Sequence, residues 1–156
     1  MLNTRHTYVF TLFVMMIAVL ALVWPMDAAL SARMTLPGPL PGEVVSVYDG
    51  DTFDVRVRVW VDQIVETHVR VNGIDAPEIH GKCEKEKKMA QEAKQELAQL
   101  VQNGKVRLYN VRFEKYAGRV LADVETADGK SIGQHMIDQG LVRAYHGKKR
   151  QSWCEG

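Results

Sequence analysis

The chain has 156 residues, enough for one ordinary domain with an extension, and its hydrophobic content of 46% and charged content of 25% exclude a disordered protein. Its formal charge of +1 excludes a strongly basic surface overall, so any contact with nucleic acid has to use a local patch. Composition therefore indicates a globular domain and leaves its function open.

The first 32 residues differ from the rest of the chain. Residues 8–24 carry no charge, come shortly after Arg5 and are followed by Pro25 and several small residues. This pattern predicts a signal peptide or, because the apolar run reaches the lower length for crossing a bilayer, a membrane anchor. Either prediction places the rest of the chain in a periplasmic or extracellular setting. Residues 33–41, rich in Pro and Gly, are expected to link this segment to a domain at 42–156.

Cys83 and Cys154 are the two cysteines of the chain. In an oxidising compartment such a pair is most simply a disulfide, which would close a loop of about seventy residues and stabilise the fold by roughly 4 kcal/mol. A zinc site would instead recruit His80, His135 or His146. His80 and Cys83 form only half of such a site, so the sequence favours the disulfide.

Alternating apolar residues, typical of half-buried strands, predict the β-structure of the domain. They occur in five runs: 42–48, 53–60, 67–72, 106–113 and 119–124. The apolar phase slips between Leu108 and Tyr109, which predicts a bulge in the fourth strand. A further short strand is expected at 141–145.

Two other segments have the apolar spacing of helices, at about 87–101 and at 132–139. The charged residues at 82–88 are interpreted as a solvated face of the longer helix. Five short strands with this helix between the third and fourth predict an α+β, mainly β fold of the OB type. Such a fold is a five-stranded barrel, here with a short helix after strand five, and it binds nucleic acids or sugars on one face.

Three short motifs carry side chains suited to phosphodiester chemistry. They are Asp49-Gly50-Asp51-Thr52 after the first strand, Arg70 to Glu78 after the third, and Tyr116-Ala117-Gly118-Arg119 before the fifth. Carboxylates can ligate a hard cation, arginine can clamp a phosphate with two hydrogen bonds, and glutamate can transfer a proton. Each motif alone is a common surface turn. It is the occurrence of all three in this order that indicates a functional site.

In that order the motifs resemble the thermonuclease (staphylococcal nuclease) family of Ca²⁺-dependent nucleases, over roughly residues 42–145. The resemblance implies an exported endonuclease that hydrolyses DNA and RNA with little sequence preference. It implies that the carboxylates of Asp51 and Asp75 and the main-chain carbonyl of Ala76 hold Ca²⁺. Glu78 would be the general base.

The resemblance also assigns the groups that meet the substrate. Arg70 and Arg119 would stabilise the charge of the phosphorane-like transition state, and Tyr116 and Tyr145 would bind the nucleic acid. Three departures from the family pattern stand out: Ala76 replaces the usual Thr, the Tyr116–Arg119 motif is one residue longer, and the chain lacks a long helix after Tyr145. A disulfide from Cys83 to Cys154 could tie down that end instead.

Two other function classes compete with the enzyme. A catalytically silent OB-fold module would bind nucleic acid or protein, but such modules typically lose acidic or arginine positions that this chain keeps. A membrane-tethered structural protein is supported only by residues 8–24. The sequence thus predicts a monomeric nuclease that contacts a membrane only through that segment, and only if the segment is not cleaved.

Overall fold

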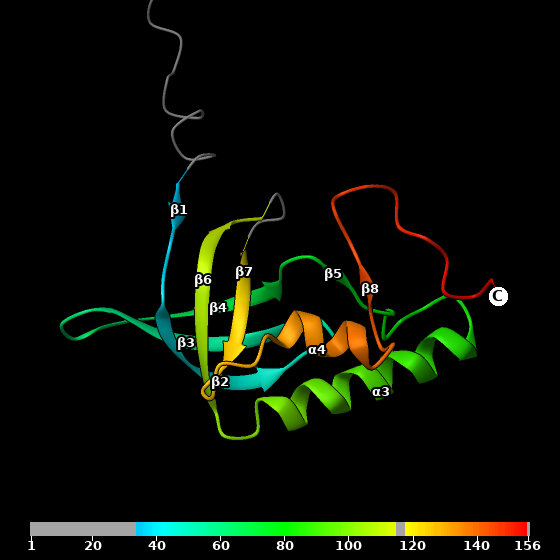
Figure 1. Cartoon of the computed structure of the whole chain (residues 1–156), viewed down its shortest axis with the longest axis horizontal. Coiled ribbons are helices and arrows are strands. Elements are labelled where there is room, and N and C mark those ends of the chain that lie inside the picture. The colour runs from blue at the N-terminus through cyan, green and yellow to red at the C-terminus, as the bar shows by residue number, and fades with distance from the viewer. Residues whose placement is uncertain (1–33, 115–117, 156) are drawn as a thin grey trace, which may run out of the picture. The chain divides into compact units, whose positions relative to one another are not determined.

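The computed structural model describes residues 34–114 and 118–155 (Figure 1). The apolar segment at 8–24 and the substrate-binding candidate Tyr116 therefore lie outside the described residues. In the part that is described, no helix is both long and apolar enough to cross a membrane.

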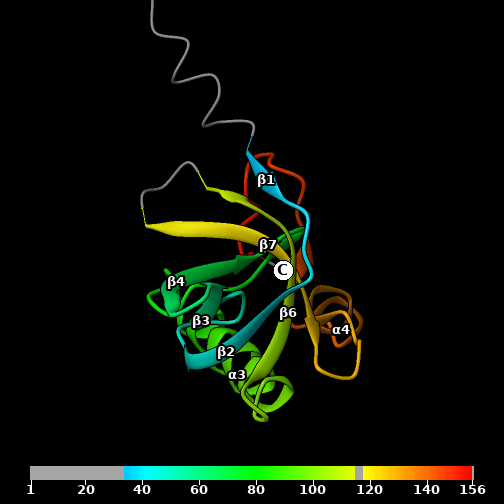
Figure 2. The same cartoon turned by 90° about the vertical axis from the view of Figure 1, so that its left-hand side faces the viewer.

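Five strands close into a barrel, as the sequence predicts (Figure 2). The strands are β2 (Leu40–Val47), β3 (Thr52–Trp60), β4 (Gln63–Val71), β6 (Lys105–Phe113) and β7 (Arg119–Thr126). The first three form an antiparallel meander, β4 pairs with β7 in parallel, and β6 bridges β7 to β2. This closure, with a helix between the third and fourth barrel strands, confirms the predicted OB-type fold.

The alternation of the strands sends one face of each into a common core. Phe53 and Val55 of β3, Val69 of β4 and Leu108 of β6 are buried there, at most 1% exposed. Each such side chain stabilises the fold by about 1.5–3 kcal/mol relative to leaving it in water. The core therefore fixes the register of the strands that carry the candidate site.

Two helices complete the domain. Helix α3 (Glu84–Leu100) buries Ala93 and Leu97 in the barrel core. Helix α4 (Ile132–Asp138) follows β7 and buries Ile132 and Met136, and the Ser131 hydroxyl accepts a hydrogen bond from a main-chain N–H of its first turn. Both helices thus pack their apolar faces against the sheet.

Helix α3 begins at Glu84, three residues earlier than expected. The charged residues at 82–88 are exposed, as their interpretation as a solvated face requires, except for one in the first turn of the helix. Glu86 is only 7% exposed. Its carboxylate accepts hydrogen bonds from the main-chain N–H groups of Lys82 (3.0 Å) and Glu78 (3.4 Å). A glutamate at the third helical position reaches back to the unpaired N–H groups before the helix. Glu86 therefore fixes the loop that enters α3.

The expected linker at 33–41 also takes part in the sheet. Strand β1 (Thr35–Leu36) pairs with the end of β6, and β2 begins at Leu40, so the compact unit starts at Thr35. The bulge predicted in β6 is present, with a register shift between Tyr109 and Arg112 and a positive φ at Asn110. Because Pro and Gly also occur in edge strands, composition alone did not separate strand from linker here.

A small second sheet lies beside the barrel. Strand β5 (Ile74–Asp75) pairs antiparallel with β8 (Arg143–Ala144), which places Asp75 opposite Arg143. The predicted strand near 141–145 is thus present in shortened form. Because β8 pairs with β5, the C-terminal residues lie next to the motif around Asp75.

Candidate active site

A buried ion pair joins two of the sequence motifs. Asp51, in the turn before β3, accepts a hydrogen bond of 2.8 Å from Nη1 of Arg70 on β4. The side chains are 2% and 9% exposed, respectively. The second carboxylate oxygen of Asp51 accepts the main-chain N–H of Ala76 at 3.0 Å. Asp51 is therefore held by three elements, and a charge buried so deeply is tolerated because it is paired.

Asp75, on β5, adds a second buried carboxylate to this cluster. It is 4% exposed, and burial together with the negative charge of Asp51 raises its pKa, although the cations Arg150 and Arg70 oppose the shift. Its Oδ1 lies 2.8 Å from Nε of Arg150 and 3.6 Å from Nη2 of Arg70, yet accepts no well-aligned hydrogen bond. This oxygen is a buried acceptor without a well-oriented donor.

Asp49 lies behind Asp51 in the same turn. Its Oδ1 accepts the main-chain N–H of Asp51 at 2.9 Å, the arrangement of a turn-forming aspartate. Burial, reinforced by the charge of Asp51, raises the pKa of Asp49 from 3.8 to about 6. The site thus concentrates negative charge in a small buried volume.

The oxygen atoms present suit a hard divalent cation. Asp51 and Asp75 offer buried carboxylates, Oδ1 of Asp75 accepts no well-aligned hydrogen bond, and Ala76, next to Asp75 in the chain, is itself buried. Oxygen-only donors of this kind are those that Ca²⁺ and similar ions prefer. The set gives no support to zinc, which favours nitrogen and sulfur ligands.

Zinc at the cysteines is not supported either. Cys83 and Cys154 are joined by a disulfide with a Cα–Cα distance of 6.0 Å. Glu86 lies beside them, but disulfide sulfurs carry no thiolate to ligate a metal. Of the histidines considered for zinc, His135 instead pairs with Glu96, 2.7 Å from its Nε2.

Glu78 lies at the exposed edge of the cluster, with its side chain 51% exposed. The carboxylate pairs with the guanidinium of Arg150. The loop around it is held by Glu86 and by a hydrogen bond from the N–H of Gly81 to the carbonyl of Glu78 (2.9 Å). A Cβ on Gly81 would lie 2.5 Å from the Glu86 side chain, so a larger residue there would displace the Glu86 carboxylate.

Arg119, at the start of β7, lies on the same side of the sheet as Arg70. In the parallel β4–β7 pairing Arg70 is opposite Leu121, two residues beyond Arg119, a distance along the strand of about 7 Å. Nε of Arg119 lies 3.0 Å from the carboxylate of Glu114. Glu114 in turn lines a groove with Arg70.

Tyr145 lies between two grooves that flank the cluster. Its main-chain N–H donates to the carbonyl of Gly73 at 2.8 Å. One groove also includes Asp75 and Arg150, and the other includes Arg70. The structure therefore brings Tyr145 next to the candidate site.

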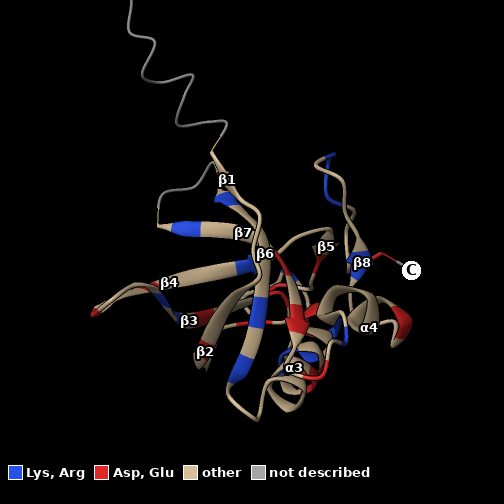
Figure 3. Cartoon of the chain, turned by 60° about the vertical axis from the view of Figure 1, so that its left-hand side comes forward, with Lys and Arg blue, Asp and Glu red and all other residues tan. Residues whose placement is uncertain are grey.

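Sequence reasoning missed Arg150. Lys148, Lys149 and Arg150 read only as a small basic cluster, because nothing local connects them to Asp75. In the structure they lie in the loop beyond β8 and line a groove that also includes Asp75. Figure 3 shows Lys and Arg residues along this loop. The one available signal was Cys154, whose pairing with Cys83 returns the end of the chain to the start of α3 (Figure 1).

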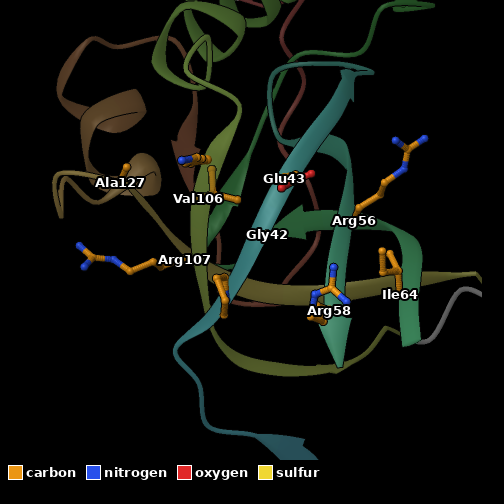
Figure 4. Close-up of a pocket in the computed structure, with 10 residues that line it drawn as sticks. Gly42, Glu43, Arg56, Arg58, Ile64, Val106, Arg107 and Ala127 are labelled. Atoms are coloured by element: carbon orange, nitrogen blue, oxygen red, sulfur yellow. The ribbon is translucent and has the colours of Figure 1, made fainter. Parts of the chain in front are cut away.

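A separate groove of about 490 Å³ lies on strands β2, β3 and β6 (Figure 4). Two of its cations have acidic partners: Arg56 pairs with Glu66 at 2.8 Å and Arg107 with Glu125 at 3.5 Å. None of the residues from the three sequence motifs lines this groove. The chemistry therefore concentrates at Asp51, Asp75 and their neighbours.

Comparison with known proteins agrees with this architecture. The family model described as "Staphylococcal nuclease homologue" matches residues 68–154, which is 87 of the 156 residues. The domain of this family is a nuclease fold, and the OB-type barrel is consistent with it. The chain belongs to the staphylococcal nuclease homologue family.

Relatives with curated names point the same way. The "Probable endonuclease LCL3" of Phaeosphaeria nodorum is 34% identical over 86 residues, covering 53% of this chain and 29% of that protein. The "Probable endonuclease lcl3" of Pyrenophora tritici-repentis is 30% identical over 129 residues, covering 69% and 47%. The chain spans less than half the length of these curated relatives.

Proposed function

We propose that this protein is a Ca²⁺-dependent endonuclease that hydrolyses phosphodiester bonds of DNA and RNA with little sequence preference. The observation that carries the proposal is the buried Asp51–Arg70–Asp75 cluster beside the exposed Glu78. The endonuclease names of the fungal relatives and the matching family support nuclease activity in general. The choice of ion and the residue roles come from the donor set and from the family resemblance.

Asp51, Asp75 and the carbonyl of Ala76 would hold the ion, because they supply buried oxygen donors at one point of the barrel edge. Bound there, Ca²⁺ would supply Lewis-acid stabilisation to a phosphoryl oxygen. The change from Thr to Ala at position 76 leaves the main-chain oxygen in place. Oδ1 of Asp75 accepts no well-aligned hydrogen bond and is neutralised only by the nearby charges of Arg150 and Arg70, an environment that already favours a cation.

Glu78 would accept the proton of the attacking water as that water forms a bond to phosphorus and the ester oxygen leaves. Its half-exposed carboxylate can be reached by solvent, as this role requires. Main-chain hydrogen bonds to Glu86 hold the loop that carries it, so the carboxylate is presented from a fixed backbone.

Arg70 and Arg119 would donate hydrogen bonds to the phosphate oxygens as negative charge develops. Arg70 is oriented in advance by Asp51 and by the carbonyl of Ile74 (3.3 Å), so little reorganisation is needed at the moment of reaction. Arg119 lies further along the same side of the sheet. Each such donor is typically worth about 10²–10³-fold in rate.

Contacts to phosphate rather than to bases explain the expected lack of sequence preference, since the backbone is the same at every nucleotide. Tyr145 in the groove beside Asp75 can contact the sugar and base, and Tyr116 has the corresponding role in the resemblance. We also propose that the protein acts outside the cytoplasm, because a Cys83–Cys154 disulfide persists in oxidising compartments.

The direct test is cleavage of single-stranded DNA and RNA by the purified protein with Ca²⁺ and with a chelator. Cleavage that requires Ca²⁺ is expected. Binding of the nucleic acid without cleavage at any divalent cation tested would contradict the proposal and favour a silent binding module. The same assay with Mg²⁺ and Mn²⁺ separates nuclease activity in general from the dependence on Ca²⁺.

A further inference from the structure

The last residues of the domain form a strap over the edge of the site, and both of its ends are fixed. We define the C-terminal strap as residues 145–152. At its start the N–H of Tyr145 donates to Gly73, and after its end Cys154 is bonded to Cys83. Trp153, only 6% exposed, anchors it further.

A neighbouring strand reinforces this anchor. The guanidinium of Arg143 on β8 lies 3.7 Å from the centre of the Trp153 ring, and its Nη1 donates to the carbonyl of Ser152 at 3.1 Å. The strap is therefore a loop tied at both ends, with its middle residues held near the site.

The middle of the strap is basic. Lys148, Lys149 and Arg150 are exposed, and Lys149 and Arg150 line two grooves that both include Asp75. Three adjacent cations at the mouth of an acidic site provide the local basic patch that the net charge of the whole chain does not supply.

Arg150 enters the site itself. Its Nε lies 2.8 Å from Oδ1 of Asp75 and its Nη1 pairs with Glu78, so one guanidinium forms ion pairs with both carboxylates. Burial alone would lower the pKa of Arg150, but the hydrogen bond to Glu78 and the charges of Asp75 and Glu78 outweigh it and raise that pKa. Arg150 is therefore fully charged there, with its side chain 43% exposed.

This position conflicts with the proposed reaction unless Arg150 moves. A divalent cation on Asp75 and a guanidinium on the same oxygen repel each other, and Glu78 cannot take a proton while it is paired with Arg150. A guanidinium that leaves two carboxylates needs another anion, and its planar fork matches a phosphate.

We propose that Arg150 is a phosphate-binding residue of the C-terminal strap. In the free protein it holds Asp75 and Glu78, and it exchanges these carboxylates for a backbone phosphate of a single-stranded nucleic acid that enters the groove. Lys148 and Lys149 contact neighbouring phosphates. The inference rests on the proposed function, since it requires nucleic acid in this groove.

The test is binding of a short fluorescent single-stranded DNA, followed by fluorescence anisotropy over a range of salt concentrations with chelator present. Arg150→Gln is expected to weaken binding about tenfold, the effect of one lost charge-assisted contact. It should also reduce the slope of log K against log salt by about 0.7, the value for one phosphate on a single strand. Arg150→Lys should keep the slope and recover only part of the affinity.

Lys130→Gln is the matched control, because it removes one exposed positive charge from the turn before α4, and Lys130 lines neither of the two grooves that include Asp75 and Arg150. It should leave affinity and slope close to those of the wild type. The proposal would be overturned if Arg150→Gln bound the DNA as tightly as or more tightly than the wild type, with an unchanged slope. Arg150 would then be a residue that blocks the groove rather than one that binds phosphate.

Cleavage by the wild type in Ca²⁺, measured alongside, separates the two claims. A wild type that binds through Arg150 but does not cleave contradicts the proposed function alone. If the wild type cleaves and Arg150→Gln binds the DNA as the wild type does, only the proposed phosphate-binding role of Arg150 is contradicted. If the wild type does not bind the DNA, that role is overturned directly.

Discussion

The two halves of the candidate site are held in different ways. Asp51, in the turn before β3, and Arg70, on β4, are both buried and bond to each other at 2.8 Å. Glu78 and Arg150 are about half exposed, and they meet because a disulfide and Trp153 hold the end of the chain against α3. The core thus fixes the half that would hold the ion and orient Arg70, whereas the half with Glu78 and Arg150 is open to solvent and can rearrange.

Breaking the buried half should have the largest effect. Arg70→Ala would leave the carboxylate of Asp51 buried without its cation, which typically costs about 3–5 kcal/mol of folding free energy. Urea denaturation of the variant and the wild type measures this cost. The matched change on the surface, Arg56→Ala, breaks an exposed pair with Glu66 and should cost about 1 kcal/mol or less. An equal loss of folding free energy in the two variants would contradict the difference between the buried and the exposed ion pair.

Opening the disulfide tests the exposed half. Cys154→Ser should lower the free energy of unfolding by about 2–4 kcal/mol, because the unfolded chain regains the freedom of a long loop. Reduction of the wild type with dithiothreitol should have the same effect and should leave Cys154→Ser unchanged. A reducing agent that destabilises both proteins alike would mean that the bond is not the cause.

The charge crowded behind Asp51 gives a prediction for pH, measured with chelator present. Asp49 has a pKa of about 6 in the folded protein against 3.8 ordinarily, so the folded state binds more protons between these values. Its contribution to stability is therefore lost as pH rises from about 4 to 6, by an amount on the order of 2 kcal/mol. Asp49→Asn should remove this loss. If the free energy of unfolding of Asp49→Asn depended on pH in the same way as that of the wild type, the role given to Asp49 would be contradicted.

Close packing beneath the metal-ligand candidates predicts a smaller effect. A Cβ on Gly50 would lie 2.6 Å from Cβ of Ala93 and 3.0 Å from that of Ala76. Gly50→Ala should therefore cost about 1–3 kcal/mol through overpacking. Gly133→Ala in α4 meets only ordinary contacts at 3.5 Å or more, and should be neutral or slightly stabilising in thermal denaturation.

The barrel could be predicted from the sequence because its signals are local. Strict alternation gave the strands, and helical spacing gave both helices, with starts wrong by only a few residues. The motif order grouped Asp51, Arg70 and Asp75, and the structure brings these three residues together, because Asp51 and Arg70 lie at neighbouring ends of β3 and β4 and Asp75 lies on β5.

What the sequence did not show depends on contacts far apart in the chain. Glu86 looked like one charge among many at the start of a helix, and only the fold shows that it binds the loop carrying Glu78. Arg150 is 75 residues beyond Asp75, and no periodicity links them. The strand at Thr35 was missed because an edge strand of two residues has too little pattern to detect.

The central claim is that Glu78 activates water beside an ion held by Asp51 and Asp75. The most direct test compares cleavage of single-stranded DNA by the wild type and by Glu78→Gln at saturating Ca²⁺, with Ca²⁺ affinity measured by calorimetry in both. We predict that the substitution slows cleavage by about 10²–10⁴-fold and leaves the ion bound. Cleavage by Glu78→Gln at the rate of the wild type would contradict the account.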